Sequence, residues 1–223
     1  MGNIDNKSKI FRELKFLCSQ ELFLAGTETS SIITEWAICE LIRHPSIMEK
    51  VRLEIAEKLG GGKMEEAVIL GLPYLQAVVK ETMRLHLPVP LLLPHKTETD
   101  VSMYGYLIPK NTQVLVNAWA ISRDPEYWEN PTCFMPERFL DSEELDFKGQ
   151  HFSFLPFSSG RRICPALPLA HRIVSLMIAS LIYHFHWKLP FDMTPEKLDM
   201  NDKFGLTLQK EKALVLVPSP IKR

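Results

Sequence analysis

The longest stretch of this chain without a strong helix breaker covers residues 10–44, which contain no proline and only one glycine, Gly26. Apolar residues fall on several sides of such a helix, a distribution typical of a helix that runs through a core. At about 1.5 Å of rise per residue the helix is roughly 50 Å long, the width of a whole domain. Pro45 ends this helix and begins a second, amphipathic one that reaches Leu59. The chain is therefore expected to pack around one long helix.

The middle of the long helix is unusual for a buried segment, because it reads Ala25-Gly26-Thr27-Glu28-Thr29. The small residues predict a close helix–helix contact at Ala25 and Gly26. In the simplest interpretation, the Thr29 hydroxyl donates a hydrogen bond back to its own helix. A chemical role for Glu28 and Thr29 requires support from the rest of the chain.

A second unusual stretch, residues 157–166, combines glycine, two arginines and a cysteine just before a long apolar segment. Pro165 suits the first position of the following helix, which would make Cys164 its N-cap. Free amide donors, the helix dipole and the arginines would favour a thiolate there. Gly160 allows a positive φ and close approach to a flat ligand. The alternative is that Cys164 is a small buried hydrophobic residue, as most single cysteines are.

Between these stretches, Pro73 predicts the start of a helix that ends near His86 and carries Glu81 and Arg84 on one face. Most such pairs are exposed ion pairs that contribute little stability. Three prolines then forbid helix around residues 91–93 and leave that segment extended. Short strands are predicted at residues 101–104 and 113–116. A hairpin is predicted from residues 204–208 and 213–217, after a helix from Cys164 to about His186.

Composition excludes several classes of protein. The chain has 223 residues, of which 46% are hydrophobic, and its 26 Lys+Arg against 27 Asp+Glu give a net charge of −1. A nucleic-acid surface would need a basic excess. The four cysteines are scattered without zinc spacing, which indicates reduced thiols. Residues 1–9 lack the apolar core of a signal peptide, and the most apolar run, residues 173–183, is too short to span a bilayer. We therefore expect a sizeable core, no nucleic-acid partner and no membrane anchor within this chain.

Four segments resemble, in order, motifs of the cytochrome P-450 superfamily. Residues 25–29 fit Ala/Gly-Gly-x-Asp/Glu-Thr, residues 81–84 fit Glu-x-x-Arg, residues 134–139 fit the Pro-Glu-Arg-Phe segment, and residues 157–166 fit Phe-x-x-Gly-x-Arg-x-Cys-x-Gly. The last motif departs at Ala166, where the family usually has glycine, so a slightly tighter fit under a haem is expected.

The resemblance implies a fold that is mainly α with small β-sheets. Residues 1–223 would form the C-terminal portion of a P-450 domain, without its N-terminal half and membrane anchor. Residues 117–121 and 204–209 look like those of plant microsomal members, in particular the geraniol-hydroxylase branch.

By this resemblance, the Cys164 thiolate would bind the iron of haem b as its axial ligand and push electron density toward cleavage of the O–O bond. Arg162 would hold a haem propionate through charge-assisted hydrogen bonds. His95 stands where the family often has a second propionate partner, although an ordinary polar residue after a turn is an equal alternative. The expected haem-binding set is completed by Phe157, Gly160 and Ala25.

Other roles also come from the resemblance. Gly26 would make room for oxygen, while Glu28 and Thr29 would organise its protonation. Glu81 and Arg84 would join Arg138 in a buried triad that fixes the cysteine loop, which is favourable only if every member is paired. The substrate pocket would be lined by Ala25, Val89, Leu92, Leu93, Phe204 and Leu206.

The implied activity is monooxygenation of a small lipophilic, terpenoid-like substrate with O2. Electrons would come from NADPH through NADPH–cytochrome P-450 reductase, at the cytosolic face of the endoplasmic reticulum, with the missing anchor as the only membrane attachment. A truncated, non-catalytic fragment with weak or no haem binding is one alternative. A haem-thiolate isomerase or dehydratase is another, although such enzymes do not need Glu28 and Thr29. Without the missing half, the apolar residues Leu17, Leu24, Ile32 and Trp36 are expected to face water.

Overall fold

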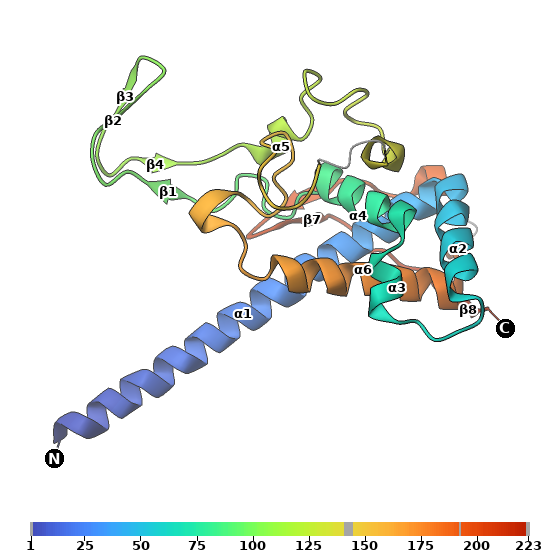
Figure 1. The fold of residues 1–223 in the computed structure, drawn as a ribbon, viewed down its shortest axis with the longest axis horizontal. Coiled ribbons are helices and arrows are strands. Elements are labelled where there is room, and N and C mark those ends of the chain that lie inside the picture. Colours follow the sequence, from blue (N-terminus) through green and yellow to red (C-terminus); the bar gives the residue numbers. More distant parts are fainter. Residues whose placement is uncertain (1, 141–144, 192, 222–223) are drawn as a thin grey trace.

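The computed structural model describes the backbone of residues 2–140, 145–191 and 193–221, with side chains from residue 19 onward. Helices dominate it, and the strands are short, which confirms the predicted class (Figure 1). The α-helices are α1 (Gly2–Arg43), α2 (Pro45–Leu59), α3 (Glu66–Leu70), α4 (Pro73–Leu85), α5 (Ala118–Ile121) and α6 (Leu167–His184). Short 3-10 helices are η1 (Pro136–Phe139), η2 (Gly160–Arg162) and η3 (Pro195–Lys197).

Helix α1 is continuous over 42 residues and ends at Arg43, one residue before the predicted end at His44. Gly26 does not interrupt it. Its second half, from Ser30 to Ile42, is mostly buried, whereas residues 19–27 are exposed. Figure 1 shows the first half projecting away from the rest of the molecule. The expectation of a helix buried throughout is therefore wrong for residues 19–27, because no described element packs against them.

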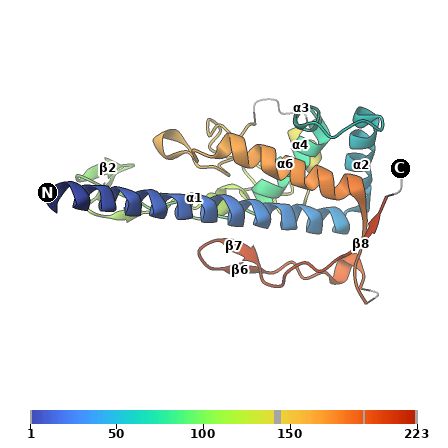
Figure 2. The same ribbon diagram turned by 90° about the horizontal axis from the view of Figure 1, so that it is seen from below.

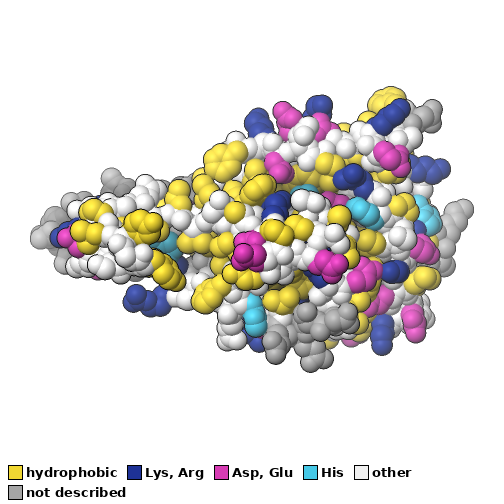
Figure 3. All heavy atoms as spheres, turned by 90° about the horizontal axis from the view of Figure 1, so that it is seen from above, with side chains coloured by type: hydrophobic (Ala, Val, Ile, Leu, Met, Phe, Trp, Pro, Cys, Tyr) yellow, Lys and Arg dark blue, Asp and Glu magenta, His cyan; other side chains and the backbone are white. Residues whose placement is uncertain are grey.

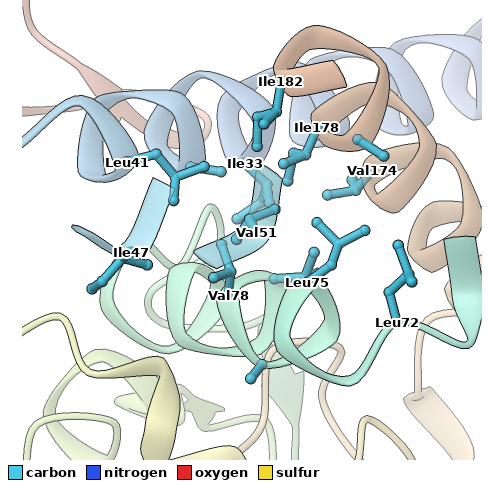
Figure 4. Close-up of a cluster of buried hydrophobic side chains, with 14 of the residues drawn as sticks. Ile33, Leu41, Ile47, Val51, Leu72, Leu75, Val78, Val174, Ile178 and Ile182 are labelled. Atoms are coloured by element: carbon cyan, nitrogen blue, oxygen red, sulfur yellow. The ribbon is translucent and has the colours of Figure 1, made fainter. Parts of the chain in front are cut away.

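The core lies where the second half of α1 meets α2, α4 and α6. Figure 4 shows its apolar side chains pointing toward one another from these helices, among them Ile33, Val51, Val78 and Ile178. Each such side chain contributes about 1.5–3 kcal/mol when it is fully buried. This core holds the buried half of α1 in place.

Helix α6 is long and apolar enough to cross a membrane, judged by length and composition alone. One face of it is buried, with Val174, Ile178 and Ile182 among the buried side chains, and it packs on α1, α2, α3 and α4. These contacts match the predicted buried helix. Helix α6 ends at His184, two residues earlier than expected, because Phe185 is already extended.

The described strands form antiparallel pairs. The first two pairs are β1 (His95–Lys96) with β4 (Gln113–Val114), and β2 (Val101–Met103) with β3 (Tyr106–Ile108). Tyr104 and Gly105 make the tight β2–β3 turn with positive φ angles of 49° and 81°. The strand predictions at residues 101–104 and 113–116 are thus close, and strands β1 and β3 were not predicted.

The C-terminal pairing differs from the predicted hairpin. Strand β6 (Asp202–Phe204) turns back at once to pair with β7 (Leu208–Lys210), and the turn is closed by the Gly205 N–H donating to the Thr207 carbonyl at 3.0 Å. Strand β8 (Val217–Pro220) instead pairs with β5 (Phe185–Lys188). The prediction that residues 204–208 and 213–217 pair with each other is wrong, because three residues suffice for a turn inside the first segment.

Candidate functional site

Cys164 does not cap helix α6, so the prediction for Cys164 and Pro165 is wrong. The helix begins at Leu167, its N-cap is Ala166, and the proline in its first turn is Pro168. Either proline satisfies the rule that the first turn tolerates a missing N–H. The Leu167 N–H donates to the Cys164 carbonyl at 3.3 Å, which forms a turn that delays the helix. The helix dipole therefore acts on the thiol from farther away than expected, since its effect falls off within the first turn.

The cysteine loop is closed by its own backbone. The Cys164 N–H donates to the Phe157 carbonyl at 3.0 Å, and the Ile163 N–H donates to the Gly160 carbonyl at 3.2 Å. Gly160 adopts a φ of +63°, as predicted. The Phe157 ring packs edge-on against Phe147 in the core, with 5.6 Å between ring centroids. The loop is thus anchored at its start, and the Cys164 side chain stays half-buried and free of disulfides.

Arg162 is exposed and faces the first small sheet. It lines an open, polar pocket of about 490 Å³ together with Pro94, Lys96, Thr97 and Lys110, among others. Pro94 and Lys96 flank His95, which is half-buried and pairs with Val114 in the β1–β4 sheet. The structure therefore brings the cysteine loop beside the strand that carries His95. His95 itself does not line this pocket.

The middle of α1 is open on one side. Ala25 and Gly26 are exposed, and a Cβ added at Gly26 would meet nothing within 4 Å. The predicted helix contact at these residues is therefore absent among the described residues. The Thr29 hydroxyl donates to the Ala25 carbonyl at 2.7 Å, which confirms that it bonds back to its own helix.

The tip of the β6–β7 hairpin meets this part of α1. The buried Thr207 hydroxyl donates to Glu28 Oε1 at 2.6 Å, and Glu28 is half-buried. Figure 2 shows the hairpin lying along α1 on the side opposite α6. Sequence reasoning assigned no role to Thr207, although it is the only hydroxyl between Phe204 and Leu208. A lone hydroxyl in an apolar turn needs a partner when buried, and that was the available signal.

The residues expected to line a pocket lie in two groups beside that contact. Phe204 and Leu206 are exposed at the hairpin tip. The Leu208 N–H donates to the Pro88 carbonyl at 2.8 Å, which ties the hairpin to the proline-rich segment. In that segment Val89 is half-buried, Leu92 is buried and Leu93 is exposed. No hydrogen bond between described residues joins either group to the cysteine loop.

Glu81, Arg84 and Arg138 do form one buried network. Arg84 Nε donates to Glu81 Oε2 at 2.7 Å and Arg84 Nη2 donates to Glu81 Oε1 at 2.8 Å, a bidentate pair in which both side chains are fully buried. Arg138 Nε donates to Glu81 Oε1 at 3.2 Å, and so does the Met135 N–H at 2.8 Å. The alternative of an exposed ion pair is therefore wrong.

The remaining Arg84 donors bind the segment between α5 and η1. They reach the carbonyls of Ser122 and Pro131 at 2.7 Å and of Cys133 at 3.1 Å. The Trp128 ring lies 5.1 Å from the Arg84 guanidinium carbon. A buried charge group is tolerated only when its donors are satisfied, and here they bind three loop carbonyls.

The donor set of the site is a single thiol. No group of three or more His, Cys, Asp or Glu side chains within the described ranges is arranged to hold a metal ion. The exposed Cys133 contributes its carbonyl to Arg84, and Cys39 is buried. Burial raises the pKa of the Cys39 thiol to about 12. Burial thus excludes Cys39 as a ligand but not the exposed Cys133, and the closed loop around the half-buried Cys164 is what favours Cys164.

Comparison with known proteins decides the family. The profile described as Cytochrome P450 matches residues 5–217. The chain belongs to the cytochrome P450 family. Two plant relatives are similar to it: cytochrome P450 76AD1 of Beta vulgaris is 53% identical over 201 residues, which is 90% of this chain and 40% of that protein. Geraniol 8-hydroxylase of Swertia mussotii is 51% identical over 90% of this chain and 41% of that protein.

The iridoid oxidase of Catharanthus roseus is 50% identical over 96% of this P450 chain and 42% of the oxidase. A zebra fish cytochrome P450 solved with progesterone has a TM-score of 0.80 and 36% identity, over 90% of this chain and 45% of that one. The predicted family and the resemblance to the geraniol-hydroxylase branch are confirmed. The chain spans about two fifths of the length of these curated relatives.

Proposed function

We propose that this chain is the haem-thiolate portion of a cytochrome P450 monooxygenase. The observation that carries the proposal is the cysteine loop, which the bond between the Cys164 N–H and the Phe157 carbonyl closes and which leaves the thiol accessible. In this proposal residues 1–223 form part of one P450 domain. The preceding part of that domain would correspond to the unmatched length of the relatives.

The residues present fit a haem. A haem iron needs one protein thiolate, and Cys164 carries an accessible thiol on a loop with little bulk at Gly160. A flat ring also needs an opposite face without large side chains, and Ala25 and Gly26 leave the middle of α1 open. Exposed Arg162 supplies a cation near the edge of the loop for a carboxylate.

In the proposed enzyme the haem and the protein have different roles. Haem b, when bound, supplies the oxygen chemistry, and the protein binds the haem and orients it toward the substrate. Cys164 would bind the haem iron, and Phe157 and Gly160 would shape the loop that carries it. Arg162 would bind one haem propionate, and His95, on the strand beside the cysteine loop, would bind the other.

On the other face, Gly26 would leave space for oxygen. The Thr29 hydroxyl and the Glu28 carboxyl would hold and move protons. The triad of Glu81, Arg84 and Arg138 would help to fix the cysteine loop by holding the segment between α5 and η1, where Arg84 binds three carbonyls.

The names of the relatives support a substrate class. Two of them are a geraniol 8-hydroxylase and an iridoid oxidase, so we propose a small, lipophilic, terpenoid-like substrate. Ala25, Val89, Leu92, Leu93, Phe204 and Leu206 would line its pocket. Electrons would come from NADPH through NADPH–cytochrome P450 reductase, with the whole protein at the cytosolic face of the endoplasmic reticulum membrane.

A second candidate is a non-catalytic fragment, and one observation favours it. The chain spans only about two fifths of the length of its relatives, and residues 19–27 of α1 are exposed. An isomerase or dehydratase is less well supported, because Glu28 and Thr29 suit proton delivery to oxygen.

The test uses a chimera in which the preceding part of the Swertia mussotii geraniol 8-hydroxylase is joined to residues 1–223. Reduced chimera with carbon monoxide should give the red-shifted Soret band of a haem thiolate. Cys164→Ser should abolish that band, whereas Cys18→Ser, Cys39→Ser and Cys133→Ser should retain it. Survival of the band in the Cys164 variant would overturn the assignment.

A further inference from the structure

The hairpin tip and the acid on α1 are joined by one short contact. The Thr207 hydroxyl lies 2.6 Å from Glu28 Oε1, and the two residues are 179 positions apart in the chain. An O–H donor at about 2.5–2.7 Å from a carboxylate oxygen is typical of a charge-assisted hydrogen bond, which is stronger than a neutral one. Thr207 is only 6% exposed, so water does not readily replace it as the partner of Glu28.

Backbone hydrogen bonds restrain the hairpin tip that carries Thr207. The Gly205 N–H closes the turn on the Thr207 carbonyl, and the Leu208 N–H donates to the Pro88 carbonyl. The hydroxyl therefore sits in a turn that is closed by an internal hydrogen bond and tied by a second one to the proline-rich segment. The same turn carries the exposed side chains of Phe204 and Leu206.

We propose that Thr207 is a positioning residue that holds the Glu28 carboxylate against the hairpin tip. This inference rests on the proposed function, in which Glu28 handles protons. The position of the acid then depends on the turn that also carries Phe204 and Leu206. A lipophilic substrate that packs on these two side chains contacts the same turn. Binding of the substrate therefore affects the position of the Glu28 carboxylate.

The experiment compares Thr207→Val with Thr207→Ser in the haem-loaded chimera, with geraniol as the probe. Valine keeps the shape and removes the hydroxyl, whereas serine keeps the hydroxyl. A hydrogen bond to a charged group is typically worth enough to change an equilibrium roughly tenfold or more. Thr207→Val should therefore lower product formed per NADPH about tenfold, toward the level of Glu28→Gln. Thr207→Ser should stay near the parent, and the double variant should be no worse than Glu28→Gln alone.

Two readouts do not depend on turnover. The infrared carboxylate band that disappears in Glu28→Gln should shift in Thr207→Val and stay in place in Thr207→Ser. Geraniol binding, followed by its spectral titration, should change less than about twofold in Thr207→Val, since the hydroxyl binds the acid and not the apolar probe.

The outcomes separate this inference from the proposed function. If Glu28→Gln lowers coupling while Thr207→Val leaves both coupling and the infrared band unchanged, Thr207 is a packing residue and the inference alone is overturned. If Glu28→Gln leaves coupling unchanged, the proton role of Glu28 fails and the inference fails with it. Loss of haem binding in Thr207→Ser as well as in Thr207→Val would assign the hairpin turn a purely structural role and would also overturn the inference.

Discussion

At the scale of single residues, the three described cysteines differ in environment. Cys39 is fully buried, Cys164 is half-buried and Cys133 is exposed. Because burial raises the pKa of the Cys39 thiol to about 12, that thiol stays protonated at pH 8. The thiolate is the reactive form, so Cys39 is the least reactive of the three.

These environments predict a labelling order in the chimera. At pH 8 a thiol reagent should modify Cys133 at once and Cys39 only after denaturant is added. Cys164 should be labelled in haem-free protein and protected in haem-loaded protein. Peptide-resolved mass spectrometry separates the sites, and labelling of native Cys39 at the rate of Cys133 would contradict the burial.

A second residue-scale prediction concerns Thr29. Its hydroxyl donates to the Ala25 carbonyl, so its lone pairs remain available to accept. Alanine is a better helix former by a few tenths of a kcal/mol, so Thr29→Ala should leave α1 and the haem content of the chimera intact. We expect reducing equivalents to go to peroxide instead of product, measured as peroxide and product per NADPH. Thr29→Ser is the matched control, and unchanged coupling in Thr29→Ala would make Thr29 a packing residue.

At the scale of elements, the triad couples α4 to η1 and to the segment between α5 and η1. Glu81 has no exposed surface, and Arg84, Arg138 and the Met135 N–H all donate to it. Removing one partner of a buried pair leaves an uncompensated charge, which costs about 3–5 kcal/mol.

Glu81→Ala should therefore sharply reduce the yield of folded haem protein and lower the melting temperature of the chimera. Lys148→Ala is the control, because the Lys148–Asp146 ion pair is largely exposed at 3.0 Å and such pairs contribute about 0–1 kcal/mol. Normal haem content and an unchanged melting temperature in Glu81→Ala would show that the network does not stabilise the fold.

Element boundaries show what local sequence determines. Pro45 and Pro73 begin α2 and α4 as predicted, because proline fixes φ and lacks an N–H wherever it occurs. Pro165 and Pro168 both satisfy that rule, and the choice between them depends on the turn from Cys164 to Leu167, which is set by the loop closing onto Phe157. Local rules therefore located the helix but not its first residue.

Some contacts between residues distant in sequence were predicted and others were not. The pairing of Glu81 with Arg84 and Arg138 was predicted from family resemblance and is present, since two motifs contain its three members. The contact of Thr207 with Glu28 was not predicted, because no local sequence pattern relates a hydroxyl in a turn to an acid on a helix 179 residues away. The hairpin error has the same origin, since periodicity identifies strands but not their partners.

At the scale of the whole molecule, the apolar surface is only partly covered. Ile32 and Trp36 are buried, in contrast to the expectation, because Leu198, Met200 and Leu214 of the C-terminal segment pack on them. Leu24 is exposed as expected, and the Leu17 side chain lies outside the described residues. Figure 3 shows apolar side chains along the narrow end and the centre of the face seen from above. Other large exposed apolar residues include Leu22, Phe23, Leu93, Phe204 and Leu206.

This surface predicts the behaviour of the 223-residue chain on its own. Large exposed apolar patches indicate a missing partner or a tendency to aggregate. The isolated chain should therefore elute as aggregate in size-exclusion chromatography, take up little haem and show no monooxygenase activity when reductase is supplied. The chimera, in which the preceding part is present, is the positive control. A soluble, monomeric, haem-replete preparation of the isolated chain would instead identify it as a minimal functional domain.

The division of α1 into an exposed and a buried part also predicts how its amide hydrogens exchange with solvent. Its exposed residues 19–27 and its buried segment after Ser30 share one hydrogen-bond ladder, but only the buried segment is held by the core. Amide hydrogens in the exposed turns should exchange with solvent through fraying, while those of the buried turns should exchange only with global unfolding. Glu28 and Thr29 lie where the two regimes meet. The protection of their amides from exchange would therefore report, turn by turn, how far an added partner extends the rigid part of the helix.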